Sequence, residues 1–294
     1  MILFWTVLAA TAVMVGWGGL RLIVPMLQEG GLLRPNYRGC QVPVGAGLIL
    51  ALAPGMALGP VLWWSIWAGR GAGAGEERFA LLLALTGSAL GFLGFVDDAL
   101  GSHAARGWRG HWRALWREGR LTTGGLKAIG GGAAALLSAA ALQPSPGATP
   151  WMVVPDALLI ALGANLVNLL DLRPGRALKG FLLLLLLLWA SAGWSDGGVV
   201  WRSLPVALLA LLCLPGDLKG RFMLGDTGAN ALGAAWGLLA ARHLTLPLKV
   251  AAVAALAALH WYAERHSLTE VIQRVPWLRS LDQWGRGEEV EEKD

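Results

Sequence analysis

Three groups of oxygen-bearing side chains stand at the ends of long apolar runs. GFVDDAL carries the adjacent Asp97 and Asp98, and GDTG carries Asp226 just before another apolar run. NLVNLLD places Asn and Asp at three-residue intervals and ends in Asp171, so these side chains would share roughly one helical face. Carboxylate and amide oxygens are the ligands that hard divalent cations and their bound phosphates prefer.

Several carboxylates gathered at one place repel each other and raise one another's pKa unless a cation lies among them. Mg²⁺ fits this need, because it is held by one or two carboxylates together with phosphate oxygens in phosphoryl transfer. Zinc fits less well, since the five His residues show no ligand spacing and both Cys residues are isolated. The pattern therefore predicts magnesium-dependent phosphate chemistry.

Each group also has a purely structural interpretation. Asp97 and Asp98 could be solvated residues at a helix end. The amides of NLVNLLD could link helices by hydrogen bonds across a bundle, and GDTG could form a turn and cap the following helix. The sequence alone leaves these alternatives open for each group taken singly.

Basic residues accompany the acidic groups. Lys127 begins an apolar run in LKAIGGG, where it could hold a phosphate or simply anchor the helix at a membrane surface. Arg38 lies in RPNYRG, and Arg173 and Arg176 lie in DLRPGR. Arginine suits two-point contact with phosphate, so these side chains are candidates for substrate binding.

The composition is that of a membrane protein. Of 294 residues, 55% are hydrophobic and 15% are charged, against about 25% charged in soluble domains. This excludes a soluble globule, a disordered chain, a fibrous repeat and a disulfide scaffold. The net charge of +5 is too small to argue for nucleic acid, so we expect no nucleic-acid partner; the bilayer and phosphate ligands are the expected partners.

The apolar runs predict an all-α polytopic fold of about nine transmembrane helices, since a span needs about 20 mainly apolar residues. Residues 1–263 form the expected transmembrane catalytic domain, and residues 264–294 form a polar C-terminal tail. The eighth run is the shortest, so its helix is expected either to begin inside the preceding loop or to tilt little. The nine runs are 2–20, 44–69, 79–96, 126–142, 151–170, 177–194, 199–215, 228–242 and 246–263.

The distribution of basic residues predicts the orientation. With the N-terminus outside, nineteen of the 24 Lys and Arg residues fall on the cytosolic side, as the positive-inside rule requires. The C-terminus and all three acidic groups are then cytosolic. Trp108, Trp112 and Trp116, each followed by an arginine, predict a segment lying in the cytosolic membrane interface.

Taken in order, these motifs resemble a known family. RPNYRGCQVPVGAGL, GFVDDAL, the Lys127 segment, NLVNLLD, FMLGDTGAN and HSLTEVIQRVPWLRSLDQWGR are similar to motifs of the polyprenyl-phosphate N-acetylhexosamine-1-phosphate transferases, which include the MraY, WecA and TagO enzymes. The resemblance runs from about Arg34 to Arg286. It implies an MraY-like fold and a bacterial plasma membrane with the active site facing the cytoplasm.

The resemblance also implies a reaction and a set of roles. The enzyme would transfer a sugar-1-phosphate from a UDP-sugar to undecaprenyl phosphate with Mg²⁺, release UMP, and serve the synthesis of a cell-wall precursor for peptidoglycan or teichoic acid. The matching catalytic residues are Asp97, Asp98, Asp171 and Asp226, of which Asp171 and Asp226 are the expected metal ligands. The expected substrate-binding residues are Lys127, Asn165, Asn168, Arg38, Arg173 and Arg176.

Some features depart from the family. DLRPGR replaces the usual repeated Asp-Gly, and the family's histidine-rich loop has no counterpart. The donor sugar and the choice between one-step and covalent mechanisms stay open, as does the oligomeric state, including a homodimer. Two rival functions also stand: a catalytically inactive relative that binds polyprenyl phosphate, and a lipid transporter.

Overall fold

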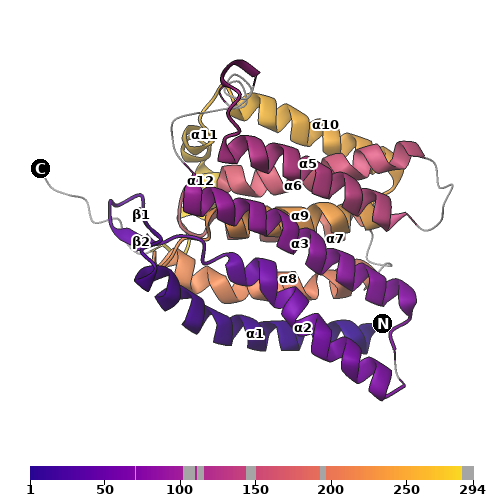
Figure 1. The fold of residues 1–294 in the computed structure, drawn as a ribbon. Coiled ribbons are helices and arrows are strands. Elements are labelled where there is room, and N and C mark those ends of the chain that lie inside the picture. Colours follow the sequence, from indigo (N-terminus) through magenta and orange to yellow (C-terminus); the bar gives the residue numbers. More distant parts are fainter. Residues whose placement is uncertain (70, 102–109, 111–115, 144–149, 193–196, 287–294) are drawn as a thin grey trace, which may run out of the picture.

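The computed structural model describes residues 1–69, 71–101, 110, 116–143, 150–192 and 197–286. In this part the chain is mainly helical, with one small antiparallel hairpin near the N-terminal helix (Figure 1). The helices are α1 (Ile2–Glu29), α2 (Leu48–Trp67), α3 (Ala74–Leu100), α5 (Thr123–Leu142), the 3₁₀ turn η1 (Pro150–Met152), α6 (Val153–Leu170), α7 (Arg176–Ala192), α8 (Gly197–Leu218), α9 (Gly225–His243), α10 (Leu246–Ala263), α11 (Leu268–Arg274) and α12 (Pro276–Gln283).

Within the described ranges, seven helices are long and apolar enough to cross a membrane: α1, α2, α3, α5, α6, α8 and α10. The chain is therefore a multi-pass membrane protein. The other two predicted spans also form helices, but α7 has only 17 residues and α9 is rich in Gly and Ala. The expected all-α polytopic class is confirmed. Of the nine expected spans, seven are long and apolar enough by this measure, and the count of nine stays a prediction.

Helix α9 lies inside the bundle, which explains its composition. It begins at Gly225, inside the loop before the eighth apolar run, as the sequence predicts, and it is buried from residue 227 to residue 241. It packs most extensively against α3 and α6. A Cβ on Gly233 would collide with the Gly163 backbone of α6, so small residues allow the close approach. A helix that is surrounded by other helices needs small side chains that allow close packing, rather than the large apolar side chains that face lipid.

A β-hairpin that the sequence did not predict lies at one end of the bundle. Strands β1 (Leu33–Pro35) and β2 (Gln41–Pro43) are three residues each, too short for an alternating pattern to be recognised. The Asn36 side chain accepts hydrogen bonds from the amides of Arg38 and Cys40 at 2.9 and 3.1 Å and forms the turn. The amide of Met223 donates to the Pro43 carbonyl at 2.8 Å, which fixes the hairpin beside the start of α9.

The C-terminal tail folds as two short helices, α11 and α12, at the same end of the bundle as the hairpin (Figure 1). Ser267 caps α11, accepting from the Glu270 amide. The tail therefore adds ordered structure near the start of α7, rather than only polar chain. Most of the predicted interfacial segment around Trp108 and Trp112 lies outside the described residues.

Candidate functional site

The acidic groups of GFVDDAL and GDTG meet at the start of α9. Asp98, on the last turn of α3, accepts hydrogen bonds from the amides of Asp226 and Thr227 at 2.9 and 3.0 Å and from the Thr227 hydroxyl at 2.5 Å. Both carboxylate oxygens of Asp98 are thus used to cap α9, because the first amides of a helix have no partner within the helix. Gly94 and Gly225 make this possible, since a Cβ on Gly94 would collide with the Asp226 backbone and one on Gly225 would collide with Asp98.

Lys127 supplies positive charge between the carboxylates. Its ammonium on α5 forms an ion pair with Asp226 and lies 3.5 Å from the Asp97 carboxylate. With its amide turned to satisfy both neighbours, Asn168 donates to Asp226 at 2.8 Å and accepts from Lys127 at 3.2 Å. Thr123 also hydrogen-bonds Asp97. Three helices and the first turn of α9 therefore converge on one lysine.

Asp171 also contacts the start of α9. It follows α6, and its carboxylate accepts a hydrogen bond from the Gly225 amide. Burial raises the pKa of Asp171 well above its usual range, and the nearby negative charge of Asp217 raises it further. We call Asp97, Asp98, Asp171, Asp226 and Lys127 together the acidic cluster.

A cavity of about 840 Å³ opens beside the acidic cluster. Its polar end is formed by Asp97, Asp98, Lys127, Asp226 and Asn165. Apolar or small residues of α3, α5 and α6 form much of the remaining wall, and the polar residues Arg34, Asn230, His260 and Glu264 from other segments also line the cavity. The apolar and small residues include Leu90, Leu93, Ala128, Gly131, Gly132, Ala161 and Leu162. The cavity can thus hold a ligand with an anionic head and an apolar body.

A second, much smaller cavity of about 30 Å³ lies on the Asp171 side. Its wall includes Asp171, Arg173, Tyr37 and Asp217. The guanidinium groups of Arg38 and Arg173 lie 5.1 and 5.0 Å from the centre of the Tyr37 ring, within the range of cation–π contact. Two of the three predicted arginines are therefore together, but beside this small cavity rather than in the large one.

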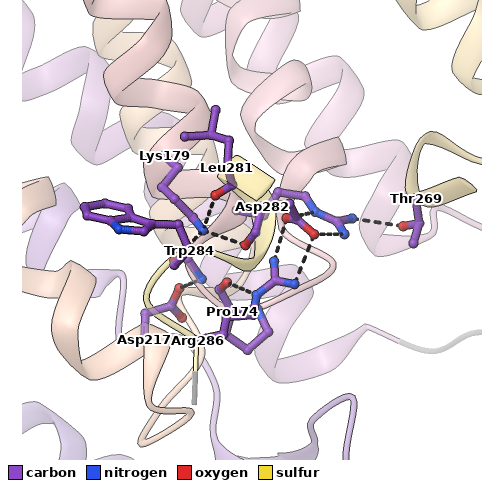
Figure 2. Close-up of polar contacts among 10 residues, drawn as sticks. Pro174, Lys179, Asp217, Thr269, Leu281, Asp282, Trp284 and Arg286 are labelled. Atoms are coloured by element: carbon purple, nitrogen blue, oxygen red, sulfur yellow. Dashed lines mark hydrogen bonds and ion pairs between the residues drawn. The ribbon is translucent and has the colours of Figure 1, made fainter. Parts of the chain in front are cut away.

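The third predicted arginine lies elsewhere. Arg176 is buried and forms a two-point ion pair with Asp282 of α12, at 2.8 and 3.0 Å (Figure 2). Its guanidinium also donates to Thr269 at 2.9 Å. The structure does not bring Arg176 to either cavity, because the tail takes up its hydrogen-bonding capacity.

Sequence reasoning missed two functional candidates, Asp217 and Asp282. Asp217 accepts a hydrogen bond of 2.6 Å from the Gly175 amide and lines the second cavity. It stands nine residues before Asp226 in PGDLKGR, so an acid beside Gly at another helix end was an available signal. Asp282 had no such signal, since it lies in a polar tail.

The carboxylates beside the two cavities partly fit the ligand requirements of Mg²⁺. In the described part of the chain, no group of three or more His, Cys, Asp or Glu side chains is arranged to hold a metal ion. Mg²⁺ needs only one or two carboxylates when phosphate oxygens complete its shell, and Asp97 and Asp226 both line the large cavity. Of the two ligands that the sequence predicts, Asp226 has this position, whereas Asp171 lines the second cavity.

A scan of the chain against known protein families finds no match, and a search of characterised proteins finds no relative. The two cavities and the acidic cluster are therefore the structural basis for a function.

Proposed function

We propose that this protein transfers a sugar-1-phosphate, of N-acetylhexosamine type, from a UDP-sugar to undecaprenyl phosphate and releases UMP. One observation carries this proposal: Lys127 lies between Asp97 and Asp226 in a cavity that also has an extended apolar wall along α3, α5 and α6. A lipid phosphate has this same division, with an anionic head and a hydrocarbon chain. The motif resemblance supports the same reaction.

The geometry suits the reaction in which two anionic phosphates must meet. An oxygen of the lipid phosphate attacks the sugar-bearing phosphorus of the donor, and the bond from that phosphorus to UMP breaks. The attacking phosphate needs no general base, because its second pKa of about 6 leaves it largely ionised near neutral pH. Lys127 would screen the repulsion between the phosphates and orient the attack.

The remaining residues divide between cation binding and positioning. Asp226 would hold Mg²⁺ together with substrate phosphate oxygens, and the ion would supply positive charge to the phosphates in the transition state. Asp97 holds Lys127 in place, and Asp98 holds the first turn of α9, which carries Asp226. Arg38 and Arg173, beside the second cavity, would contact the nucleotide end of the donor.

We further propose nine spans with the N-terminus outside and the acidic cluster facing the cytoplasm of a bacterial plasma membrane. Helices α7 and α9 would be the two additional spans, and α9 can cross without apolar side chains because other helices surround it. The excess of Lys and Arg at the end that carries the acidic cluster supports this orientation.

An observation on α6 favours the enzyme over a lipid transporter. Transporters commonly keep ionisable groups inside the membrane along the path of the transported molecule. Asp156 is the embedded carboxylate suggested by the sequence, and it forms a 2.6 Å ion pair with Lys249 of α10. Both side chains are buried, at 2% and 7% exposure, and neither lines the large cavity.

The test is an assay of UMP release by the purified protein with undecaprenyl phosphate, Mg²⁺ and a panel of UDP-N-acetylhexosamines. We expect turnover with at least one donor, loss of turnover in EDTA, and loss in Asp226→Asn. Glu270→Gln is the matched control, because it makes the same change in an exposed ion pair with Arg274 on α11. Silence of the wild-type protein with every donor would favour a binding protein without catalytic activity.

A further inference from the structure

The C-terminal tail carries a buried carboxylate, that of Asp282, which pairs with two arginines (Figure 2). Asp282 accepts from Arg176 at 2.8 and 3.0 Å and from Arg286 at 2.6 and 3.0 Å. Asp282 and Arg176 are 8% and 5% exposed, so little water competes for these bonds. Charged hydrogen bonds of this kind are short, directional and position both partners.

Lys179 fastens the end of α12 to α7. Its ammonium donates to the carbonyls of Leu281, Asp282 and Trp284 at 2.8, 2.6 and 3.0 Å (Figure 2). These carbonyls are among the last of a helix and lack partners within it, so a buried ammonium satisfies all three of its own donors there. We call Arg176, Lys179, Asp282 and Arg286 the C-terminal clamp.

The clamp also forms a hydrogen bond with the loop of residues 172–175, which follows Asp171. Arg286 donates from its Nε to the Pro174 carbonyl at 2.9 Å, and on the other side the Gly175 amide donates to Asp217 of α8 at 2.6 Å. Arg176 ends the loop. The loop is thus fastened from the tail and from α8.

This loop forms one wall of the second cavity. Leu172, Arg173 and Pro174 line that cavity together with Asp171 and Tyr37. Arg173 reaches the Tyr37 ring. The position of the loop therefore sets the distance between the loop and the β1–β2 turn that carries Tyr37. A tail segment more than 100 residues away in the chain, at a separation of 106 between Arg176 and Asp282, therefore determines the shape of this wall.

We propose that Asp282 is a positioning residue for nucleotide binding: through the C-terminal clamp it holds the loop of residues 172–175 so that Arg173 is placed to contact the UDP part of the donor. This inference rests on the proposed function for the identity of the ligand. It adds that the tail, and not only the transmembrane helices, determines donor affinity. It also assigns Arg176 to the clamp, not to substrate contact.

The experiment measures nucleotide binding and loop protection separately. UDP binding is titrated by calorimetry, and hydrogen exchange is followed in peptides covering residues 171–179, for wild type, Asp282→Asn, Arg286→Gln and the control Glu270→Gln. Arg286→Gln is the milder variant, because it keeps the pair between Arg176 and Asp282 and removes the contact with Pro174. Undecaprenyl phosphate binding is measured in parallel.

We expect faster exchange of the loop and UDP affinity weakened by about tenfold or more in Asp282→Asn, since a displacement of about 1 Å in a ligand-contacting group such as Arg173 is enough for a loss of this size. Arg286→Gln should show smaller changes of the same kind. Lipid phosphate binding and the Glu270→Gln control should match wild type. General destabilisation of the protein would weaken both UDP binding and lipid phosphate binding, so a loss of UDP binding alone indicates a local effect.

The inference is wrong if loop exchange is unchanged in both clamp variants, if exchange is faster but UDP affinity is unchanged, or if UDP and lipid phosphate binding are lost equally. Failure of wild-type protein to bind UDP would overturn it as well. If UDP binds and the clamp variants weaken it, but wild type releases no UMP from any donor, the inference stands and the proposed reaction fails.

Discussion

The acidic cluster and the C-terminal clamp lie at the same end of the molecule and balance charge in opposite ways. The acidic cluster has four carboxylates and one ammonium group, and much of it faces a cavity of about 840 Å³. The clamp has three cations around Asp282 and is closed to both cavities, with backbone carbonyls taking the ammonium of Lys179. Excess charge beside an open space suits a ligand, whereas charged groups whose hydrogen bonds are made within the protein suit a fixed structure.

The two lysines give the sharpest test of this comparison. We expect Lys127→Met to reduce turnover at saturating donor by roughly 10²–10³-fold, the effect of removing one donor that stabilises transition-state charge. Lys179→Met should leave this turnover nearly intact and lower the melting temperature by a few degrees instead, because buried carbonyls lose their donors. UMP release and thermal unfolding of the same samples measure both effects.

The opposite pattern would break the comparison. If Lys179→Met abolished turnover at saturating donor without lowering the melting temperature, the clamp would belong to the reacting site. If Lys127→Met retained turnover, Lys127 would be a helix anchor, as one interpretation of the sequence allows.

A second prediction concerns how the acidic cluster is assembled. Gly94→Ala should destabilise the protein by about 1–3 kcal/mol, the usual effect of overpacking, because its Cβ would collide with the backbone of Asp226 and push α3 from α9. Gly87→Ala on the same helix is the matched control, since the nearest atom to its Cβ is 3.9 Å away. Thermal unfolding of both variants tests this, and equal stability would show that α3 can shift without strain.

The smallest effect is expected from pH. Burial by itself would raise the pKa of Asp282, but hydrogen bonds and charges from Arg176 and Arg286 outweigh it, so the pKa is lowered. The charged form therefore stabilises the folded protein fully above the unfolded pKa of about 3.9. This contribution disappears as the pH falls below that value and through the lowered pKa of the folded state.

The difference in melting temperature between wild type and Asp282→Asn should accordingly be constant above about pH 5 and shrink below about pH 4. Glu270→Gln, whose ion pair is exposed, should show little difference from wild type at either pH. A difference for Asp282→Asn that persists unchanged into acid would mean that the carboxylate charge contributes nothing to the clamp.

Local patterns in the sequence were sufficient for the helices and for the location of the acidic groups. Long apolar runs predict helices because each backbone group in a bilayer must be satisfied within its own segment. The predicted start of α9 inside its loop is confirmed at Gly225. The hairpin around Asn36 was missed, since its strands are too short to show a period.

The sequence by itself determined that this is a helical membrane protein with acids and cations at the ends of its helices, because those features depend on composition and short spacings. Only the tertiary structure decided which partner each charge takes: Asp98 caps α9, Lys127 joins Asp97 to Asp226, and Arg176 turns to Asp282. Residues of one type look alike in sequence. Their partners lie 30 to 128 positions away, and only packing of the helices brings those atoms within hydrogen-bonding distance.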